Sequence, residues 1–283
     1  MAAMDNQSHT NIRVSYRILP LAALRDNYIW LLRHDPSGTA MAVDPGEAQV
    51  LLDYLQRENL QLAGILVTHH HADHMGGIAA LRRRFPAVRV HGPAAEAIDG
   101  LDERLTGGAV VEFPQAGAQF QVLAVPGHTL GHLAYYDRNH PAGGVLFSGD
   151  TLFSAGCGRI FEGTAAQMQH SLARLRALPA ETRVYCAHEY TAANLRFALA
   201  VEPENVELAE HAARVAQLRA AGQPSLPSTL ALERRINPFL RWDEPSVQQA
   251  AARFRGWEGQ DQPLEPADAV AVFAAIRAWK DDF

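Results

Sequence analysis

The chain has 283 residues and a formal net charge of −6, with 48% hydrophobic and 20% charged residues. This composition excludes a disordered, collagen-like or coiled-coil protein, and the length suits two domains or one large domain with an appendage. The negative charge gives no electrostatic reason to bind nucleic acid or an anionic membrane. We therefore expect a soluble globular protein.

Neither secretion nor membrane insertion is expected. Residues 1–17 lack a basic stretch followed by an apolar run, and no run of roughly 18 apolar residues occurs. Cys157 and Cys186 are the only cysteines, too few for a disulfide framework. We therefore expect a cytoplasmic protein.

Short β-rich runs alternate with helical patterns over the first two thirds of the chain. The expected strands cover residues 12–18, 28–32, 40–43, 65–67, 88–90, 110–113, 120–125, 133–136, 145–147 and 184–186. Apolar residues at spacings of three and four predict helices over 50–57, 78–85 and 165–178. The mixture predicts an α/β protein in which helices cover sheets.

The pattern changes after His188. Ala-rich helical patterns follow at 192–201, 206–221, 246–254 and 267–280, and prolines separate them. We expect a boundary near residue 191, between a catalytic domain over 12–190 and a helical, substrate-binding domain over 191–283.

The strongest chemical signal is the sequence THHHADH at residues 68–74, directly after an apolar run. In an extended stretch, positions i and i+2 point the same way, so His69 and His71 can bind one metal. Asp73 and His74 then point elsewhere and can start a second site. Three imidazoles and a carboxylate packed this closely would be costly if buried without a cation, which disfavours a purely structural role.

Three further strand ends carry candidate ligands, namely His128, Asp150 and His188. Ligands that converge from separate strand ends are typical of sites at the edge of a sheet. Imidazole and carboxylate without thiolate suit zinc, iron or manganese. We expect His70 and His132 to orient the ligands by hydrogen bonding or packing.

These motifs resemble the ligand motifs of the metallo-β-lactamase superfamily. More narrowly, the chain resembles the glyoxalase II, or hydroxyacylglutathione hydrolase, family from about residue 12 to its end. The narrower match rests on the sequences GCGRIFEGT at 156–164, HEYT at 188–191, PST at 227–229, NPF at 237–239 and RAWKD at 277–281. The resemblance implies an αββα sandwich, the metallo-β-lactamase fold, followed by a small all-helical domain at the C-terminus.

The resemblance also implies a dinuclear metal site, for which zinc is favoured and iron and manganese are alternatives. One metal would be bound by His69, His71 and His128, and the other by Asp73, His74 and His188, with Asp150 bridging. Asp73 and Asp150 would be the catalytic carboxylates. The implied activity is thioester hydrolysis by a metal-bridging hydroxide, converting S-(2-hydroxyacyl)glutathione such as S-D-lactoylglutathione to glutathione and D-lactate, the second step of methylglyoxal detoxification.

The family's substrate contacts map onto Arg159, Phe161, His188, Tyr190, Arg277 and Lys280. A basic cluster there would supply the local attraction for glutathione carboxylates that the net charge does not. Some relatives have Lys and Tyr at the positions of Arg159 and Phe161, so a hydroxyl contact to the peptide is missing here. The expected partner is this small molecule alone, neither nucleic acid nor membrane, and we expect a monomer.

Three other functions are alternatives. A one-iron persulfide dioxygenase shares the HxHxDH motif, but those relatives lack the helical C-terminal domain. A nucleic-acid phosphodiesterase would need a basic surface, and this chain is acidic. A non-catalytic metal-binding protein would be expected to lose some of the seven ligand positions, which are all present here.

Overall fold

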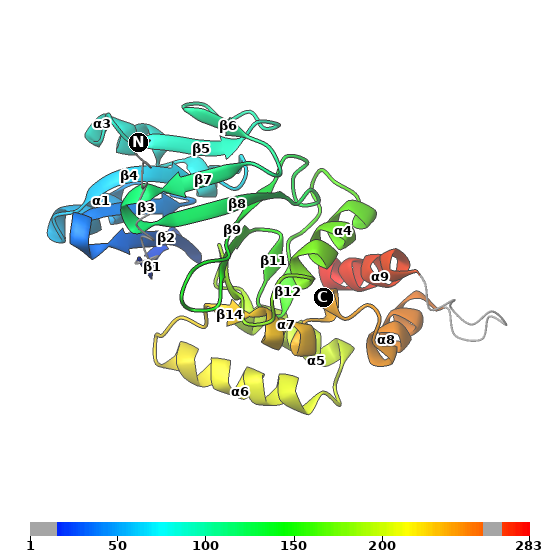
Figure 1. Cartoon of the computed structure of the whole chain (residues 1–283). Helices are drawn as coiled ribbons and strands as arrows, with labels where there is room; N and C mark the ends of the chain where they lie inside the picture. Colours follow the sequence, from blue (N-terminus) through cyan, green and yellow to red (C-terminus); the bar gives the residue numbers. More distant parts are fainter. Residues whose placement is uncertain (1–15, 257–267) are drawn as a thin grey trace, which may run out of the picture.

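A computed structural model describes residues 16–256 and 268–283 (Figure 1). The first residues of the expected strand at 12–18 and of the expected domain at 12–190 lie outside the described part of the chain. So do residues 257–267 of the expected helical domain.

Two six-stranded sheets form the centre of the molecule. The first has the order β1 (Arg17–Ala23), β2 (Asn27–His34), β3 (Thr39–Val43), β4 (Gln61–Leu66), β5 (Arg89–Pro93) and β6 (Glu103–Leu105). The second has the order β14 (Ser228–Thr229), β13 (Arg183–Cys186), β10 (Val145–Gly149), β9 (Leu133–Asp137), β8 (Ala118–Ala124) and β7 (Val110–Phe113). A separate hairpin joins β11 (Leu152–Phe153) to β12 (Gly156–Cys157).

Strand periodicity explains how these sheets stack. On β2, Trp30 and Leu32 enter the apolar cluster between the two sheets, whereas Ile29 and Leu31 enter the cluster on the outer face. Successive side chains of a strand point to opposite faces, so a strand buried on both faces must be apolar throughout. The resulting layers are helix, sheet, sheet and helix, which confirms the predicted αββα fold.

Helices cover both outer faces. α1 (Gln49–Arg57) and α3 (Ile78–Arg84) pack on the first sheet, and the short α2 (Ala72–Met75) precedes α3. α4 (Ala165–Arg176) packs on the second sheet, and its capping box, formed by Thr164 and Gln167, fixes its first turn.

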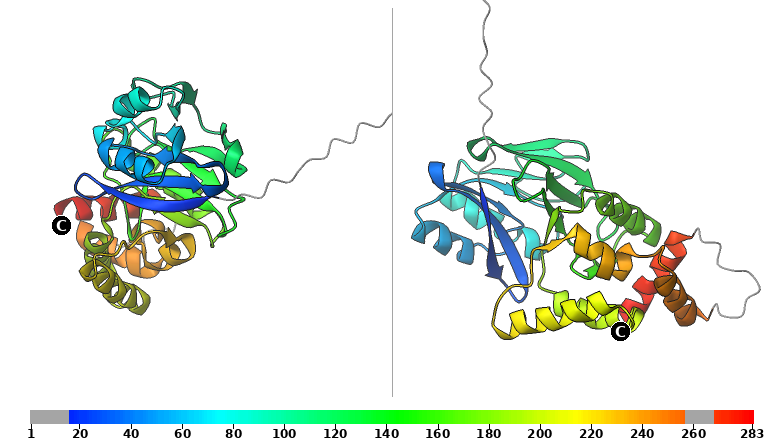
Figure 2. Two further views of the ribbon diagram at one scale, coloured as in Figure 1. Left: turned by 90° about the vertical axis from the view of Figure 1, so that its left-hand side faces the viewer. Right: turned by 60° about the horizontal axis from the view of Figure 1, so that its bottom comes forward.

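The C-terminal helices lie together on one flank of the sandwich (Figure 2). They are α5 (Thr191–Val201), α6 (Val206–Ala220), α7 (Leu230–Ile236), α8 (Pro245–Arg255) and α9 (Ala269–Asp282). α9 shares the apolar cluster of α4, through Phe273 and Ile276 beside Leu172 and Leu175. This region also contributes β14, which pairs antiparallel with β13, so the C-terminal part adds a strand to the second sheet.

Most expected elements are present in the described part of the chain, with shifted ends. The first described strand, β1, covers 17–23 and overlaps the expected strand at 12–18 at residues 17 and 18; its later part was not expected because Pro20 interrupts the β-rich run. β1 is an edge strand, where a missing backbone N–H is tolerated. The sequence analysis missed the short elements β6, β11, β12, β14, α2 and α7, which hold too few residues to show a period. No helix in the described ranges is long and apolar enough to cross a bilayer.

The inter-sheet core generates a prediction for stability. Phe147 is fully buried there, with its ring centroid 5.5 Å from that of Tyr185. We expect Phe147→Ala to lower the free energy of unfolding by about 3–5 kcal/mol, measured by urea denaturation, because the cavity cannot collapse between two sheets. Val110→Ala, at a position 53% exposed, is the control and should cost under about 0.5 kcal/mol. A loss for Phe147→Ala as small as the control's would contradict this packing.

Candidate metal centre

The structure brings together all seven predicted metal-ligand residues, here called the histidine–aspartate cluster. Each follows a strand: residues 69–74 follow β4, His128 follows β8, Asp150 follows β10 and His188 follows β13. The cluster therefore combines side chains from both sheets at one edge of the sandwich. Its members are His69, His71, Asp73, His74, His128, Asp150 and His188.

The cluster contains two sets of converging ligand atoms. In the first, His71 Nδ1 lies 3.0 Å from His69 Nε2 and 3.1 Å from His128 Nε2. In the second, Asp73 Oδ2 lies 3.4 Å from both His74 Nε2 and His188 Nε2. The chain turns into α2 at Ala72, which carries Asp73 and His74 away from the first set.

Asp150 lies between the two sets. Its Oδ2 is 3.5 Å from His128 Nε2, whereas its Oδ1 is 3.5 Å from His74 Nε2 and 3.4 Å from His188 Nε2. One carboxylate thus offers an oxygen to each side. His69, His74 and Asp150 also converge as a third combination, so His69 borders both sets.

These distances fit cations. Two ligand atoms about 2.1 Å from one zinc ion in tetrahedral geometry are about 3.4 Å apart, which equals the 3.4 Å separations in the second set and exceeds the 3.0 and 3.1 Å separations in the first by a few tenths of an ångström. Among the described residues, Asp150 Oδ1 and both ring nitrogens of His74 are buried without a hydrogen bond, although Asp44 Oδ2 lies 3.0 Å from His74 Nδ1. Buried polar atoms without partners are costly unless something binds them, so the residues present fit a metal centre.

Neighbouring acceptors select the histidine tautomers that metal binding needs. The carbonyl of Arg159 lies 2.7 Å from His128 Nδ1 and can only accept, so His128 carries its proton on Nδ1. The carboxylate of Asp26 lies 2.8 Å from His188 Nδ1 and likewise keeps a proton on that nitrogen. In both residues Nε2 then faces the cluster, where a metal ion can take the place of any proton on that nitrogen, and this arrangement orients metal-binding imidazoles.

His69 has the same tautomer for a different reason. The hydroxyl of Thr68 donates to Asp44 at 2.8 Å, so Thr68 Oγ1 is left to accept from His69 Nδ1 at 3.0 Å. His69 Nε2 is therefore free to bind. Asp44 is a central acceptor because it also accepts a hydrogen bond from the backbone N–H of Thr68.

The cluster balances opposing effects on ionisation. Burial lowers the pKa of His69 and His128 below the ordinary value. Burial also opposes the charging of His188, but its bonds to Asp150 and Asp73 outweigh this and raise its pKa to about 10. His74 and His188 together lower the pKa of the Asp150 carboxyl group, His188 and His74 lower that of Asp73, and both effects act against burial. Both aspartates therefore remain anionic and available to cations.

Supporting residues surround the cluster. His132 is fully buried, stacks on His69 at 4.7 Å between ring centroids and accepts a hydrogen bond from the backbone N–H of Asp150, contacts that suit the orienting role expected of it. His70 Nδ1 lies 3.0 Å from Glu96 Oε2 and ties the ligand loop to that buried carboxyl group.

Sequence analysis missed Asp26, Asn27 and Glu96. Asn27 donates to Asp73 Oδ2 at 3.0 Å, beside the contact of Asp26 with His188. Asp26 lies in the turn between β1 and β2 and Asn27 is the first residue of β2, more than 40 positions from the ligand residues that they contact. No local sequence pattern distinguishes these residues from other polar residues in turns.

The predicted substrate-binding aromatics flank the cluster. Phe161, 61% exposed, has its ring centroid 5.2 Å from that of His128 and 5.6 Å from that of His71. Tyr190, 36% exposed, stacks on His188 at 4.6 Å. The two rings therefore stand beside opposite ligand sets.

The predicted basic residues form a group around Asp281. Arg159 Nε lies 3.2 Å and Arg277 Nη2 3.0 Å from Asp281 Oδ1. Arg277 is only 7% exposed and also donates to the carbonyl of Cys157, so much of its guanidinium is already bonded. Lys280 is half-buried, with Nζ 5.0 Å from the ring centroid of Phe197.

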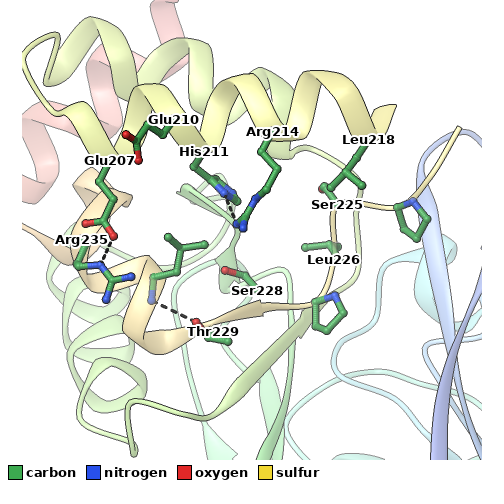
Figure 3. Close-up of a pocket in the computed structure, with 13 residues that line it drawn as sticks. Glu207, Glu210, His211, Arg214, Leu218, Ser225, Leu226, Ser228, Thr229 and Arg235 are labelled. Atoms are coloured by element: carbon green, nitrogen blue, oxygen red, sulfur yellow. Dashed lines mark hydrogen bonds and ion pairs between the residues drawn. The ribbon is translucent and has the colours of Figure 1, made fainter. Parts of the chain in front are cut away.

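A cavity of about 800 Å³ lies elsewhere, between α6 and residues 224–232 (Figure 3). Its walls include an Arg214–His211 hydrogen bond of 2.8 Å and a Glu207–Arg235 ion pair of 2.6 Å. No member of the histidine–aspartate cluster lines it. The cavity is therefore separate from the candidate metal centre.

Comparison with known families divides the chain into two matched parts. Residues 24–188 match the model of the metallo-β-lactamase superfamily. Residues 189–283 match the model described as the hydroxyacylglutathione hydrolase C-terminus. A hydroxyacylglutathione hydrolase of Chromohalobacter salexigens is 52% identical over 266 residues, which cover 94% of this chain and 99% of that protein.

Solved structures share the fold. ETHE1 from Myxococcus xanthus superposes with a TM-score of 0.60 at 26% identity, covering 94% of this chain and 99% of that one. A protein described as TTHA1623 in a di-iron-bound form superposes with a TM-score of 0.54 at 27% identity, covering 78% of this chain and 100% of that one.

The contact of Asp26 with His188 generates a prediction. Asp26→Ala removes the acceptor that holds the His188 ring, so we expect zinc affinity to fall about 10–100-fold, measured by competition with a chromophoric chelator. Asp53→Ala, an exposed acid on α1, is the matched control and should leave the affinity unchanged. Wild-type affinity in Asp26→Ala would show that the ring needs no such support.

Proposed function

Because the chain belongs to the hydroxyacylglutathione hydrolase (glyoxalase II) family of the metallo-β-lactamase superfamily and is a thioester hydrolase, we propose that its histidine–aspartate cluster is the active site. The observation that carries this proposal is the position of Asp150, with one carboxylate oxygen beside each ligand set. His69, His71 and His128 would hold one divalent ion and Asp73, His74 and His188 the other, with Asp150 shared.

The identity of the ions is a further part of the proposal. Zinc is the first choice, since imidazole and carboxylate ligands at these separations suit it, and iron and manganese accept the same ligands. The di-iron form of the related TTHA1623 supports iron as an alternative.

The chemistry requires little else from the protein. Two divalent ions held by these residues would lower the pKa of a shared water and polarise the thioester carbonyl. Asp73, whose side chain is 39% exposed, would accept a proton from the attacking water. The leaving thiol has an ordinary pKa of about 8.5, so it departs as thiolate without a dedicated general acid.

Substrate binding is proposed to use both flanks of the cluster. Phe161 and Tyr190 stand beside His128 and His188, so a thioester between them faces both ligand sets. Arg159 and Lys280 would attract the glutathione carboxylates, and Arg277 would contribute both charge and, through Asp281, the position of Arg159. His188 also borders the substrate.

Domain limits and assembly complete the proposal. We assign catalysis to residues 12–190 and substrate binding to 191–283, a division supported by family models that meet at 188 and 189. Cys157 and Cys186 are free thiols, as in a reducing cytoplasm. A monomer is expected, and gel filtration tests it.

The direct test of function is hydrolysis of S-D-lactoylglutathione by metal-replete protein, followed by loss of thioester absorbance. We expect rapid turnover, which a chelator should abolish and added metal should restore. Protein with two bound metals and no turnover would contradict the function. Asp73→Asn with both metals and undiminished kcat would contradict the proton-accepting role of Asp73 alone.

Lys280 generates a prediction about pH. Burial, together with Arg277 and Arg196, lowers the pKa of Lys280 to about 8. The ammonium is charged below this value and neutral above it, so binding of a glutathione carboxylate weakens as pH rises. We expect KM to increase about fivefold between roughly pH 7 and pH 9.5, because one charge-assisted hydrogen bond to the substrate is lost.

The matched control is Lys280→Arg, which stays charged over this range. The KM of this variant should not change with pH, once the rate of uncatalysed hydrolysis has been subtracted. An equal rise of KM in both proteins would mean that Lys280 does not contact the substrate.

A further inference from the structure

Glu233 of α7 is a fully buried carboxyl group that the reaction does not use. Its four partners are uncharged. Oε2 accepts the backbone N–H of Ala155 at 2.8 Å and Nδ2 of Asn237 at 3.0 Å. Oε1 contacts the hydroxyl of Ser154 at 3.0 Å and that of Ser228. A buried carboxyl group without a cation is costly, so its position needs an explanation.

Two of these partners form the turn of the β11–β12 hairpin. Ala155 there has φ of +54°, a conformation that L-residues adopt only when their surroundings hold them. Asn237 adds bonds to the carbonyls of Phe153 at 3.1 Å and Gly156 at 3.0 Å. The C-terminal region therefore holds the turn from one side. Ser228 on β14, which lines the cavity in Figure 3, also forms a hydrogen bond with the Glu233 carboxyl group.

The hairpin leads directly to the metal cluster. It begins after Asp150 and ends before Gly158, whose N–H donates to the carbonyl of Thr151 at 3.2 Å. A Cβ on Gly158 would lie 1.9 Å from the carbonyl oxygen of Asp150 and 3.2 Å from His128 Nδ1, so the backbone contact is close. The next carbonyl, of Arg159, fixes the His128 ring.

We propose that Glu233 is a positioning residue that acts through the β11–β12 hairpin to hold His128 and Asp150 in the relative positions that metal binding requires. The inference rests on the proposed function in taking these two residues as ligands. Asp150 borders both sets but His128 belongs to one, so loss of the anchor should weaken one metal ion more than the other.

The geometry predicts which substitutions the anchor tolerates. The backbone N–H of Ala155 and the side-chain amide of Asn237 both donate to Oε2, so that atom must be a hydrogen-bond acceptor. Oε1 faces two hydroxyls, which can donate or accept. Burial raises the pKa of the Glu233 carboxyl group. Glutamine, with its carbonyl at Oε2 and its amide at Oε1, satisfies every partner, whereas aspartate is one methylene too short.

The test measures Co²⁺ binding to chelator-stripped full-length protein by visible absorption. We expect Glu233→Gln to bind both cobalt ions within about threefold of wild type, and Glu233→Asp to bind one of them at least about tenfold more weakly. Ser154→Ala, which removes a single bond, should weaken the same ion about threefold and remains informative if Glu233→Asp does not fold.

Glu202→Asp is the matched control. Glu202 is as buried, 3% exposed, but its bonds go to Arg241 and Ser246 within the C-terminal helices. It should lower the melting temperature and leave cobalt binding unchanged. Unchanged binding in Ser154→Ala and in any folded Glu233→Asp, or an equal loss in Glu202→Asp, would overturn the proposal. Because cobalt binding is read without substrate, failure of thioester hydrolysis in the wild type would refute only the proposed function.

Discussion

The arrangement depends on one electrostatic constraint: seven imidazole and carboxylate groups are packed at separations of 3.0–3.5 Å, mostly out of contact with water. Such groups repel or remain unpaired unless cations lie among them. Two divalent ions would resolve this, since each lone pair and each anionic oxygen would then have a partner. Asp150 joins the two halves, so its position decides whether the site is one dinuclear centre or two separate ones.

The fold meets this constraint by bringing strand ends from two sheets to one edge. β4 supplies the ligands of residues 69–74 from the first sheet, while β8, β10 and β13 supply His128, Asp150 and His188 from the second. Neither sheet could build the centre alone. The acceptors that hold the imidazoles, such as Asp26 and the carbonyl of Arg159, lie on still other loops. Because the packing of the two sheets holds these loops together, the inter-sheet core also aligns the imidazoles.

Much of this was predictable from sequence because it is local. The sequence THHHADH puts four candidate ligands in one loop, and a buried β-run before each of the others predicted their common edge. Asp26, Asn27 and Glu233 escaped prediction because their roles depend on contacts between residues 46 to 162 positions apart, which no local pattern records. β14 escaped for a related reason: two residues become a strand only because β13 is beside them.

The C-terminal helices do more than complete the core. They carry Arg277 and Lys280, and through Glu233 and Asn237 they also hold the hairpin that separates Asp150 from Arg159. In the proposed function, substrate binding and the positioning of the metal ligands would therefore depend on the same group of helices.

Anomalous diffraction from crystals of the zinc-loaded protein tests the central claim most directly. The account predicts two peaks about 3.5–4 Å apart with Asp150 contributing one oxygen to each. A single fully occupied peak, or two peaks that do not share Asp150, would contradict it.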